Sequence, residues 1–199
     1  MIFTKPIVLA ASAVAALAAP LTANDSPIPG YEIVDIQWSL QAFPGGEYIN
    51  VTGTVEQVVA QLTKINPDYE KNVLAAANMT RLGADAESGL WHYLYHDCLT
   101  WPVAWTRRVW EGIMYLDGHD GVPTMGPGPA ACARVSCSWD SAIWWCNDDP
   151  VELQLDVWTS VAWGAYIIYR DCRNERDDQT SGQIFYEPNW NVIVRGDTC

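Results

Sequence analysis

Hydrophobic and polar residues alternate along residues 31–42, and this period of two predicts a strand with one buried face. A Pro-Gly-Gly turn at residues 44–46 follows, and residues 47–51 have the composition of a returning strand. We therefore expect a β-hairpin near the N-terminus of the folded domain. The apolar positions on its buried face are Ile36, Trp38, Leu40 and Ala42.

The apolar spacing then changes to that of a helix over residues 55–65. Thr54 and Gln57 have the spacing of a capping box at its start, and Asn66 and Pro67 end the run. This is the most clearly defined helix in the sequence. Residues 72–79, which come shortly after it, fit either a short helix or a strand.

The C-terminal half adds two predicted helices, over residues 102–116 and 155–172. Helices kept apart from antiparallel hairpins predict an α+β fold, a two-layer sandwich, rather than a doubly wound α/β fold. The strands predicted in this half are residues 91–97, 132–138, 142–146, 183–186 and 191–194.

The first 23 residues predict a signal peptide. Lys5 precedes an apolar run at residues 6–19 that is too short to span a bilayer, and cleavage is expected after Ala18 or Ala23. Residues 24–199 are then a single secreted domain. No later run approaches the roughly 18 apolar residues of a membrane span, so we expect none.

Composition supports a packed, acidic protein. The chain is 49% hydrophobic with 11 tryptophans, which is unlike a disordered sequence. It has 24 acidic and 11 basic residues and a net charge of −13. Because nucleic acids and anionic membranes attract proteins through clustered cations, neither is an expected partner.

All six cysteines follow residue 97, and an even number in an exported chain predicts three disulfide bonds. The sequence has no Cys-x-x-Cys pair, which is the spacing typical of zinc sites, and we expect no cofactor. The cysteines are Cys98, Cys132, Cys137, Cys146, Cys172 and Cys199. Asn-x-Ser/Thr sequons, which predict glycosylation of an exported surface, occur at Asn24, Asn50 and Asn78.

Two histidines and several carboxylates are candidates for chemistry. His92 and His96 lie about 13 Å apart on a strand at ~3.3 Å per residue, too far to share a metal ion. Asp148 and Asp149 are a candidate carboxylate pair for glycoside hydrolysis, but adjacent acids in a turn more commonly cap the following helix. No nucleophile motif accompanies them. Three further acidic residues are expected on a solvated face: Glu111, Asp117 and Asp120.

Three tryptophans are candidate contact residues. Trp144 and Trp145 are adjacent on a predicted strand, so their side chains should point to opposite faces and one of them should be exposed. Trp139 falls in the turn before that strand. An exposed indole combines a large apolar surface with a hydrogen-bond donor and suits target recognition.

Several sequence blocks resemble one group of proteins. Residues 132–138 read Cys-Ala-Arg-Val-Ser-Cys-Ser and residues 141–148 read Ser-Ala-Ile-Trp-Trp-Cys-Asn-Asp. With Cys172, residues 190–199 and the N-terminal stretch at 31–69, they resemble small secreted cysteine-rich proteins of fungi. The C-terminal cysteine layout is more distantly similar to the necrosis-inducing effector domain of plant-pathogenic fungi and to virally encoded fungal killer toxins.

The resemblance implies a disulfide-bonded α/β sandwich that acts outside the cell as a virulence effector or toxin, and it supplies no catalytic residue. The expected partner is a host or competitor target, either a protein or a cell-wall glycan. The alternatives are an extracellular carbohydrate hydrolase that uses a carboxylate pair, and a carbohydrate-binding module. The expected disulfide pairs are Cys137–Cys146 across the hairpin, Cys98–Cys172 between the later helices, and Cys132–Cys199 at the terminus.

Overall fold

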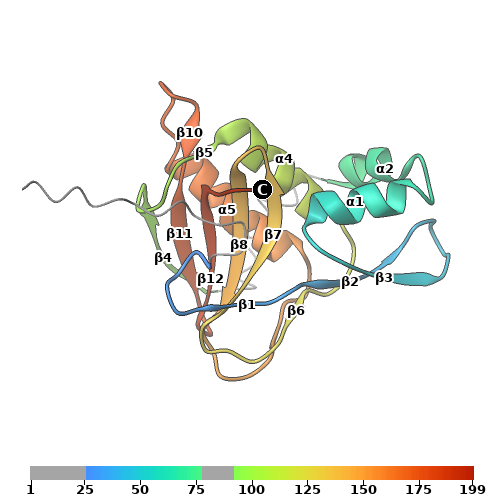
Figure 1. Ribbon diagram of the computed structural model, residues 1–199, viewed down its shortest axis with the longest axis horizontal. Coiled ribbons are helices and arrows are strands. Elements are labelled where there is room, and N and C mark those ends of the chain that lie inside the picture. Colours follow the sequence, from blue (N-terminus) through green and yellow to red (C-terminus); the bar gives the residue numbers. More distant parts are fainter. Residues whose placement is uncertain (1–25, 78–91) are drawn as a thin grey trace, which may run out of the picture.

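The computed structural model describes residues 26–77 and 92–199, and its centre is a six-stranded sheet (Figure 1). β1 runs parallel to β7, and every other neighbouring pair in this sheet is antiparallel. In spatial order the strands are β1 (Glu32–Ile33), β7 (Ala131–Ser138), β8 (Ser141–Asn147), β12 (Trp190–Gly196), β11 (Gly182–Tyr186) and β4 (Tyr93–Cys98).

Two helices, α4 (Thr106–Gly118) and α5 (Thr159–Asp171), pack side by side against one face of this sheet (Figure 1). α5 approaches closely at Gly164, where an added Cβ would lie 3.0 Å from a methyl group of Val192. The predicted α+β fold is confirmed, with helices in one layer and the sheet in another. The larger of two hydrophobic clusters fills the space between the layers.

The opposite face of the sheet carries a smaller hydrophobic cluster, built around Cys132, Trp144 and Ile193 and covered by Tyr31 and Trp101. β8 is therefore buried on both sides, and all seven of its residues are buried. The expectation that Trp144 or Trp145 would be exposed is wrong, because these side chains are 1% and 0% exposed. Each points into a different hydrophobic cluster.

The N-terminal hairpin and helices lie beside the sheet (Figure 1). The predicted hairpin is confirmed for residues 37–52, but the strand predicted over residues 31–42 is divided, because Glu32–Ile33 pairs with β7 in the main sheet. The capping box is confirmed, and Gln57 Oε1 accepts the backbone N–H of Thr54 at 3.1 Å. The segment predicted as helix or strand is helical as far as Ala76, and its residues from 78 onward lie outside the described part. These elements are β2 (Gln37–Gln41), β3 (Tyr48–Thr52), α1 (Val55–Thr63) and α2 (Tyr69–Ala76).

Two short strand pairs shift the starts of the later helices. α4 begins at Thr106 because β5 (Ala104–Trp105) pairs with β10 (Gln179–Thr180). β9 (Leu153–Gln154) pairs with β6 (Thr124–Met125), the backbone N–H of Leu155 bonds to the carbonyl oxygen of Pro123 at 2.9 Å, and α5 begins only at Thr159. No helix in residues 26–77 and 92–199 has both the length and the apolar content that a membrane span requires.

The structure contains three disulfide bonds, and the predicted pair Cys98–Cys172 is confirmed. The other two predicted pairs are wrong, because the bonds are Cys132–Cys146 and Cys137–Cys199. The hairpin register gives the reason. Its two-residue turn sets Cys137 opposite Ala142, and an irregularity between Arg134 and Ser136 then shifts the register and sets Cys132 opposite Cys146.

Candidate functional site

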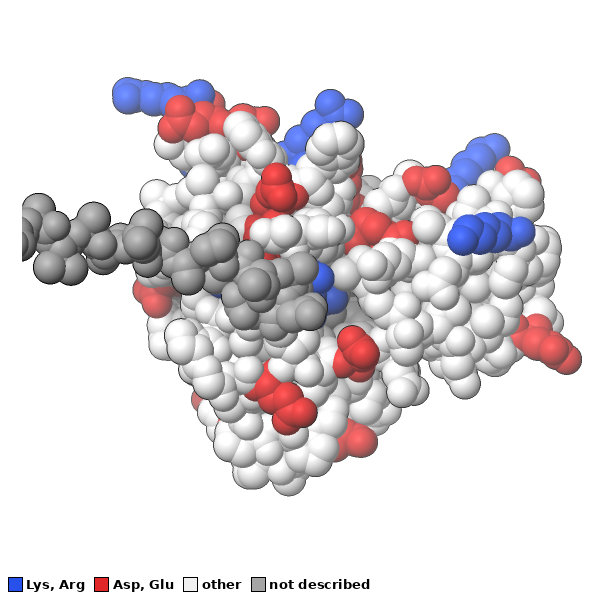
Figure 2. Space-filling model, in the orientation of Figure 1, with Lys and Arg blue, Asp and Glu red and all other residues white. Residues whose placement is uncertain are grey.

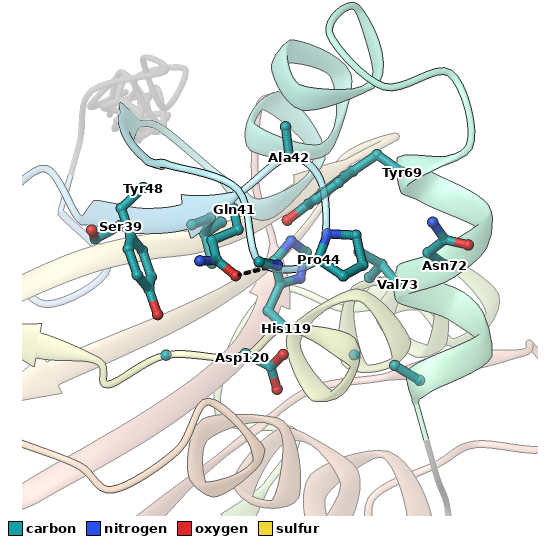
Figure 3. Close-up of a pocket in the computed structure, with 15 residues that line it drawn as sticks. Ser39, Gln41, Ala42, Pro44, Tyr48, Tyr69, Asn72, Val73, His119 and Asp120 are labelled. Atoms are coloured by element: carbon teal, nitrogen blue, oxygen red, sulfur yellow. Dashed lines mark hydrogen bonds between the residues drawn. The ribbon is translucent and has the colours of Figure 1, made fainter.

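The candidate site is a cavity of about 400 Å³ between the β2–β3 hairpin, α2 and the chain that follows α4 (Figure 3). Its size lies within the range of small-molecule pockets. Figure 3 shows Tyr48 and Tyr69 on opposite sides of His119, with Asp120 on the far side of the cavity from the hairpin turn. The polar side chains that line it include Gln41, Tyr48, Tyr69, Asn72, His119 and Asp120.

Gly118 allows the two helices that frame the cavity to meet. A Cβ at this position would lie 2.2 Å from the carbonyl oxygen of Val73 in α2, so only glycine fits without a backbone shift. α4 ends here, and the next residue is extended, with φ −91° and ψ 134°. This change of direction places His119 under the hairpin and Asp120 at the mouth of the cavity.

His119 is held as a buried, neutral imidazole. It is 4% exposed, and its Nδ1 lies 2.6 Å from the carbonyl oxygen of Tyr115, so the ring proton sits on Nδ1. Nε2 is buried and has no hydrogen-bond partner among the described residues. Burial lowers the pKa of His119 and outweighs the hydrogen bond to Tyr115 and the charge of Asp120, which both raise it. The free Nε2 is therefore a hydrogen-bond acceptor.

Aromatic rings surround this imidazole. The ring centroids of Trp38 and Tyr69 lie 5.6 and 5.9 Å from that of His119. Burial, with a smaller contribution from the charge of Asp120, raises the pKa of Tyr69 to about 12. The Tyr69 hydroxyl therefore keeps its proton at neutral pH and is a hydrogen-bond donor.

A second cavity of about 600 Å³ adjoins the first, and both are lined by Tyr48 and Asp120. It adds Asp35, Thr124 and the ring of Trp158, which stacks on Trp38 with centroids 3.9 Å apart. We call the two cavities together the hairpin groove. The described residues that line it include no Lys or Arg. Figure 2 shows acidic side chains spread over the visible face, with Lys and Arg mainly towards its margins.

The sequence-predicted contact and glycosylation residues lie outside this groove or at its edge. Trp139 is 71% exposed at the tip of the β7–β8 hairpin, and the Arg108 guanidinium lies 5.0 Å from its ring centroid. Asn50 is exposed on β3 and pairs with Ser39, which lines both cavities. The other two sequons, Asn24 and Asn78, lie outside the described residues.

Neither histidine of the predicted β4 segment has the surroundings of a metal ligand. His92 is exposed, and its Nδ1 lies 3.9 Å from a carboxylate oxygen of Glu187. His96 lies close to the sulfur atoms of Cys98 and Cys172, and these three side chains are the one group with metal-ligand geometry found in the described part of the chain. Those two sulfurs are bonded to each other, so neither is a thiolate that could bind a metal ion.

The predicted carboxylate pair has a structural role. Asp148 accepts a hydrogen bond from the Asn191 side chain at 2.8 Å, and Asp149 accepts the backbone N–H of Val151 at 3.2 Å. They do not cap the following helix, which begins ten residues later at Thr159. The expectation that Asp117 is solvated is also wrong. It is fully buried and accepts a hydrogen bond from Thr159 Oγ1 at 2.9 Å.

Three glutamates line a separate cavity of about 520 Å³, but each already bonds to a neighbour. Glu56 accepts the backbone N–H of Cys137 at 3.0 Å, and Glu70 accepts the Tyr115 hydroxyl at 2.5 Å. Glu111 pairs with Arg107 and Arg108. This arrangement is typical of carboxylates that join helices and strands, rather than of an acid and a nucleophile held toward one sugar bond.

Sequence reasoning missed His119 as a site residue. A single histidine carries no motif, and the only local signal is its place after Gly118, where the predicted helix ends. Comparisons of the chain with family models, curated proteins and solved structures found no match.

We expect His119 to make stability depend on pH. Its pKa in the folded protein lies below the ordinary value of 6.5, so the unfolded chain takes up the proton first as the pH falls. Stability contributed by the neutral ring is therefore present above about pH 6.5 and lost below it, at up to about 1.4 kcal/mol per pH unit.

Urea unfolding at pH 7.5 and pH 5.0 measures this loss. His119→Gln should lose less stability over this interval than the wild type, whereas the exposed-residue control His92→Gln should behave as wild type. Equal pH dependence in wild type and His119→Gln would show that the ring is not held neutral by the fold.

We expect Trp139→Asn to leave the free energy of unfolding within about 1 kcal/mol of wild type. Trp139 and Asp140 have φ of 48° and 56°, a conformation that asparagine adopts more readily than tryptophan. This gain opposes the loss of the exposed contact with Arg108, worth about 0.5–1 kcal/mol. Chemical denaturation measures the balance, and a loss above about 2 kcal/mol would mean that the indole is part of the core.

Proposed function

We propose that this protein is secreted and acts outside the cell, as an effector or toxin-like protein, by binding a host or competitor target through the hairpin groove. Three disulfide bonds are consistent with an extracellular protein. The sequence resemblance to small secreted cysteine-rich proteins of fungi supports the effector or toxin role.

The observation that carries the binding function is the hairpin groove itself. It combines exposed aromatic surface at Tyr48, a carboxylate at Asp120 and a buried acceptor on His119 without a partner among the described residues. Buried polar groups in native proteins normally have a partner, because leaving one unpaired costs about 1–3 kcal/mol. Trp145 Nε1 and the Tyr186 hydroxyl are also buried without a partner among the described residues, so the exposed ring of Tyr48 and the carboxylate of Asp120 are the stronger support for binding in the groove.

The test applies purified mature protein to plant tissue and to cultures of competing fungi, and scores cell death, growth and defence responses. We expect the disulfide-intact protein to be active and the reduced, alkylated protein to be inactive. Asp120→Lys, which places a cation at the mouth of the groove, should abolish the response. The control Glu187→Lys makes the same charge change at another exposed side chain, 62% accessible, and should remain active.

An intact protein without effect on any of these cells would contradict the proposal. Full activity of Asp120→Lys would leave an extracellular role but move the binding site away from the hairpin groove.

A further inference from the structure

We propose that the ligand of the hairpin groove is an uncharged oligosaccharide. This inference rests on the function proposed above and names the class of molecule that the groove binds. Three properties of the groove lead to it: its charge, its hydrogen-bonding groups, and the position of its exposed ring.

The charge of the groove disfavours anionic ligands. Its described lining has the carboxylates of Asp35 and Asp120 and no Lys or Arg, within a protein of net charge −13. A phosphate or an acidic sugar would meet repulsion there without a compensating cation. The carboxylates can instead accept hydrogen bonds from neutral hydroxyl groups.

The polar groups of the first cavity match a molecule that has many hydroxyls. The Tyr69 hydroxyl donates, the carboxylate of Asp120 accepts, and the side-chain amide of Asn72 does both. Each sugar hydroxyl is at once a donor and an acceptor, so one kind of group can pair with all three.

Tyr48 supplies the apolar part of the site. Its side chain is 70% exposed and lies where the two cavities adjoin, so it borders both. Sugar rings have apolar C–H faces that pack on aromatic rings, while their hydroxyls remain free for hydrogen bonds. Two adjoining cavities with a shared ring fit a chain of sugars better than a single one.

The glycan expected on Asn50 requires a control. Asn50 pairs with Ser39 in the hairpin, and Ser39 lines both cavities, so an attached glycan would begin beside the groove. Such a glycan could fill the groove of the same molecule. Binding should therefore be measured on enzymatically deglycosylated protein and repeated with Asn50→Gln.

The experiment titrates the mature, disulfide-intact protein with defined hexasaccharides, using calorimetry and amide NMR shifts. The uncharged probes are hexamers of β-1,3-glucose, β-1,4-glucose and N-acetylglucosamine. The charged comparators are hexamers of glucosamine and galacturonate. We expect at least one uncharged hexamer to bind and to shift the amides of residues 39–41, 48 and 119–121.

Tyr48→Ala should weaken this binding about tenfold. Tyr95→Ala is the matched control, because Tyr95 is 52% exposed on β4, at the other end of the molecule (Figure 1). Absence of binding by all uncharged hexamers, tighter binding of a charged hexamer, or unchanged binding by Tyr48→Ala would each overturn the oligosaccharide assignment.

The two proposals can fail separately. If no hexamer binds but Asp120→Lys still abolishes biological activity, the groove is the site of action and its ligand is not an uncharged sugar. If a hexamer binds in the groove but Asp120→Lys remains fully active on cells, the sugar assignment stands and the proposed function of the groove fails.

Discussion

Replacing both cysteines of one bond, as Cys98→Ala with Cys172→Ala, is expected to lower the free energy of unfolding by about 4 kcal/mol. This bond joins residues 74 positions apart, the largest separation among the three, and so restricts the unfolded chain most. It also ties β4, an edge strand of the sheet, to the C-terminal end of α5. Denaturation in guanidinium, at equal protein concentration and without reductant, measures the loss.

The matched control removes the shorter crosslink with Cys132→Ala and Cys146→Ala. Its residues are only 14 positions apart, so the same chain-entropy argument gives a smaller loss of about 3 kcal/mol. A variant lacking Cys98–Cys172 that is as stable as wild type, or a reversed order of the two losses, would show that chain restriction is not what these bonds contribute.

Trp144→Ala is expected to lower the free energy of unfolding by about 3–5 kcal/mol, because it leaves a large cavity in the smaller hydrophobic cluster. The side chain is 1% exposed, and its Nε1 donates to Asp197 Oδ2 at 3.0 Å. The alanine variant loses both the packing and this hydrogen bond. Thermal and chemical unfolding, followed by tryptophan fluorescence, measure the effect.

Trp144→Phe separates these two contributions, since it keeps an aromatic ring and removes the donor. We expect a smaller loss than for alanine, whereas Trp139→Asn should change little. Wild-type stability of Trp144→Ala would contradict the burial of this side chain. Because the alanine variant is destabilised, loss of binding in Trp144→Ala would report unfolding rather than a missing contact.

The sequence predicted well those elements whose buried face is marked by a regular spacing of hydrophobic residues along the chain. The β2–β3 hairpin alternates residue by residue, and α1 combines helical spacing with the Thr54–Gln57 capping box. Each of these signals lies within one element or two neighbouring ones. Packing against the rest of the molecule reinforces such patterns and does not need to be known in advance.

What the sequence missed depends on pairing between distant segments. β5 pairs with β10, and the backbone of Leu155 bonds to Pro123 beside the β6–β9 pair, so the first residues of both predicted helices are extended instead. The predicted Cys137–Cys146 pair is wrong because the two-residue turn sets Cys137 opposite Ala142, and the register shift between Arg134 and Ser136 sets Cys132, rather than Ala133, opposite Cys146. Composition and periodicity contain no signal for such a shift.

Local sequence patterns could not predict the candidate site for the same reason. Its residues come from the hairpin, from α2 and from the chain after α4, and only the approach of α2 to Gly118 brings them together. Trp144 and Trp145 point to opposite faces of β8, as predicted. Both faces are covered by hydrophobic residues, so neither side chain is exposed. A one-sided sheet would have exposed one of them.

The most direct test asks whether the protein is exported with all six cysteines paired. The protein is collected from the medium of its own cells, alkylated and digested without reduction, and its peptides are identified by mass spectrometry. We expect a chain that begins after residue 18 or 23, no alkylated cysteine, and linked peptides for Cys98–Cys172, Cys132–Cys146 and Cys137–Cys199. A chain retained inside the cell with residues 1–23 attached, or folded protein with alkylated cysteines, would contradict a secreted protein stabilised by these three bonds.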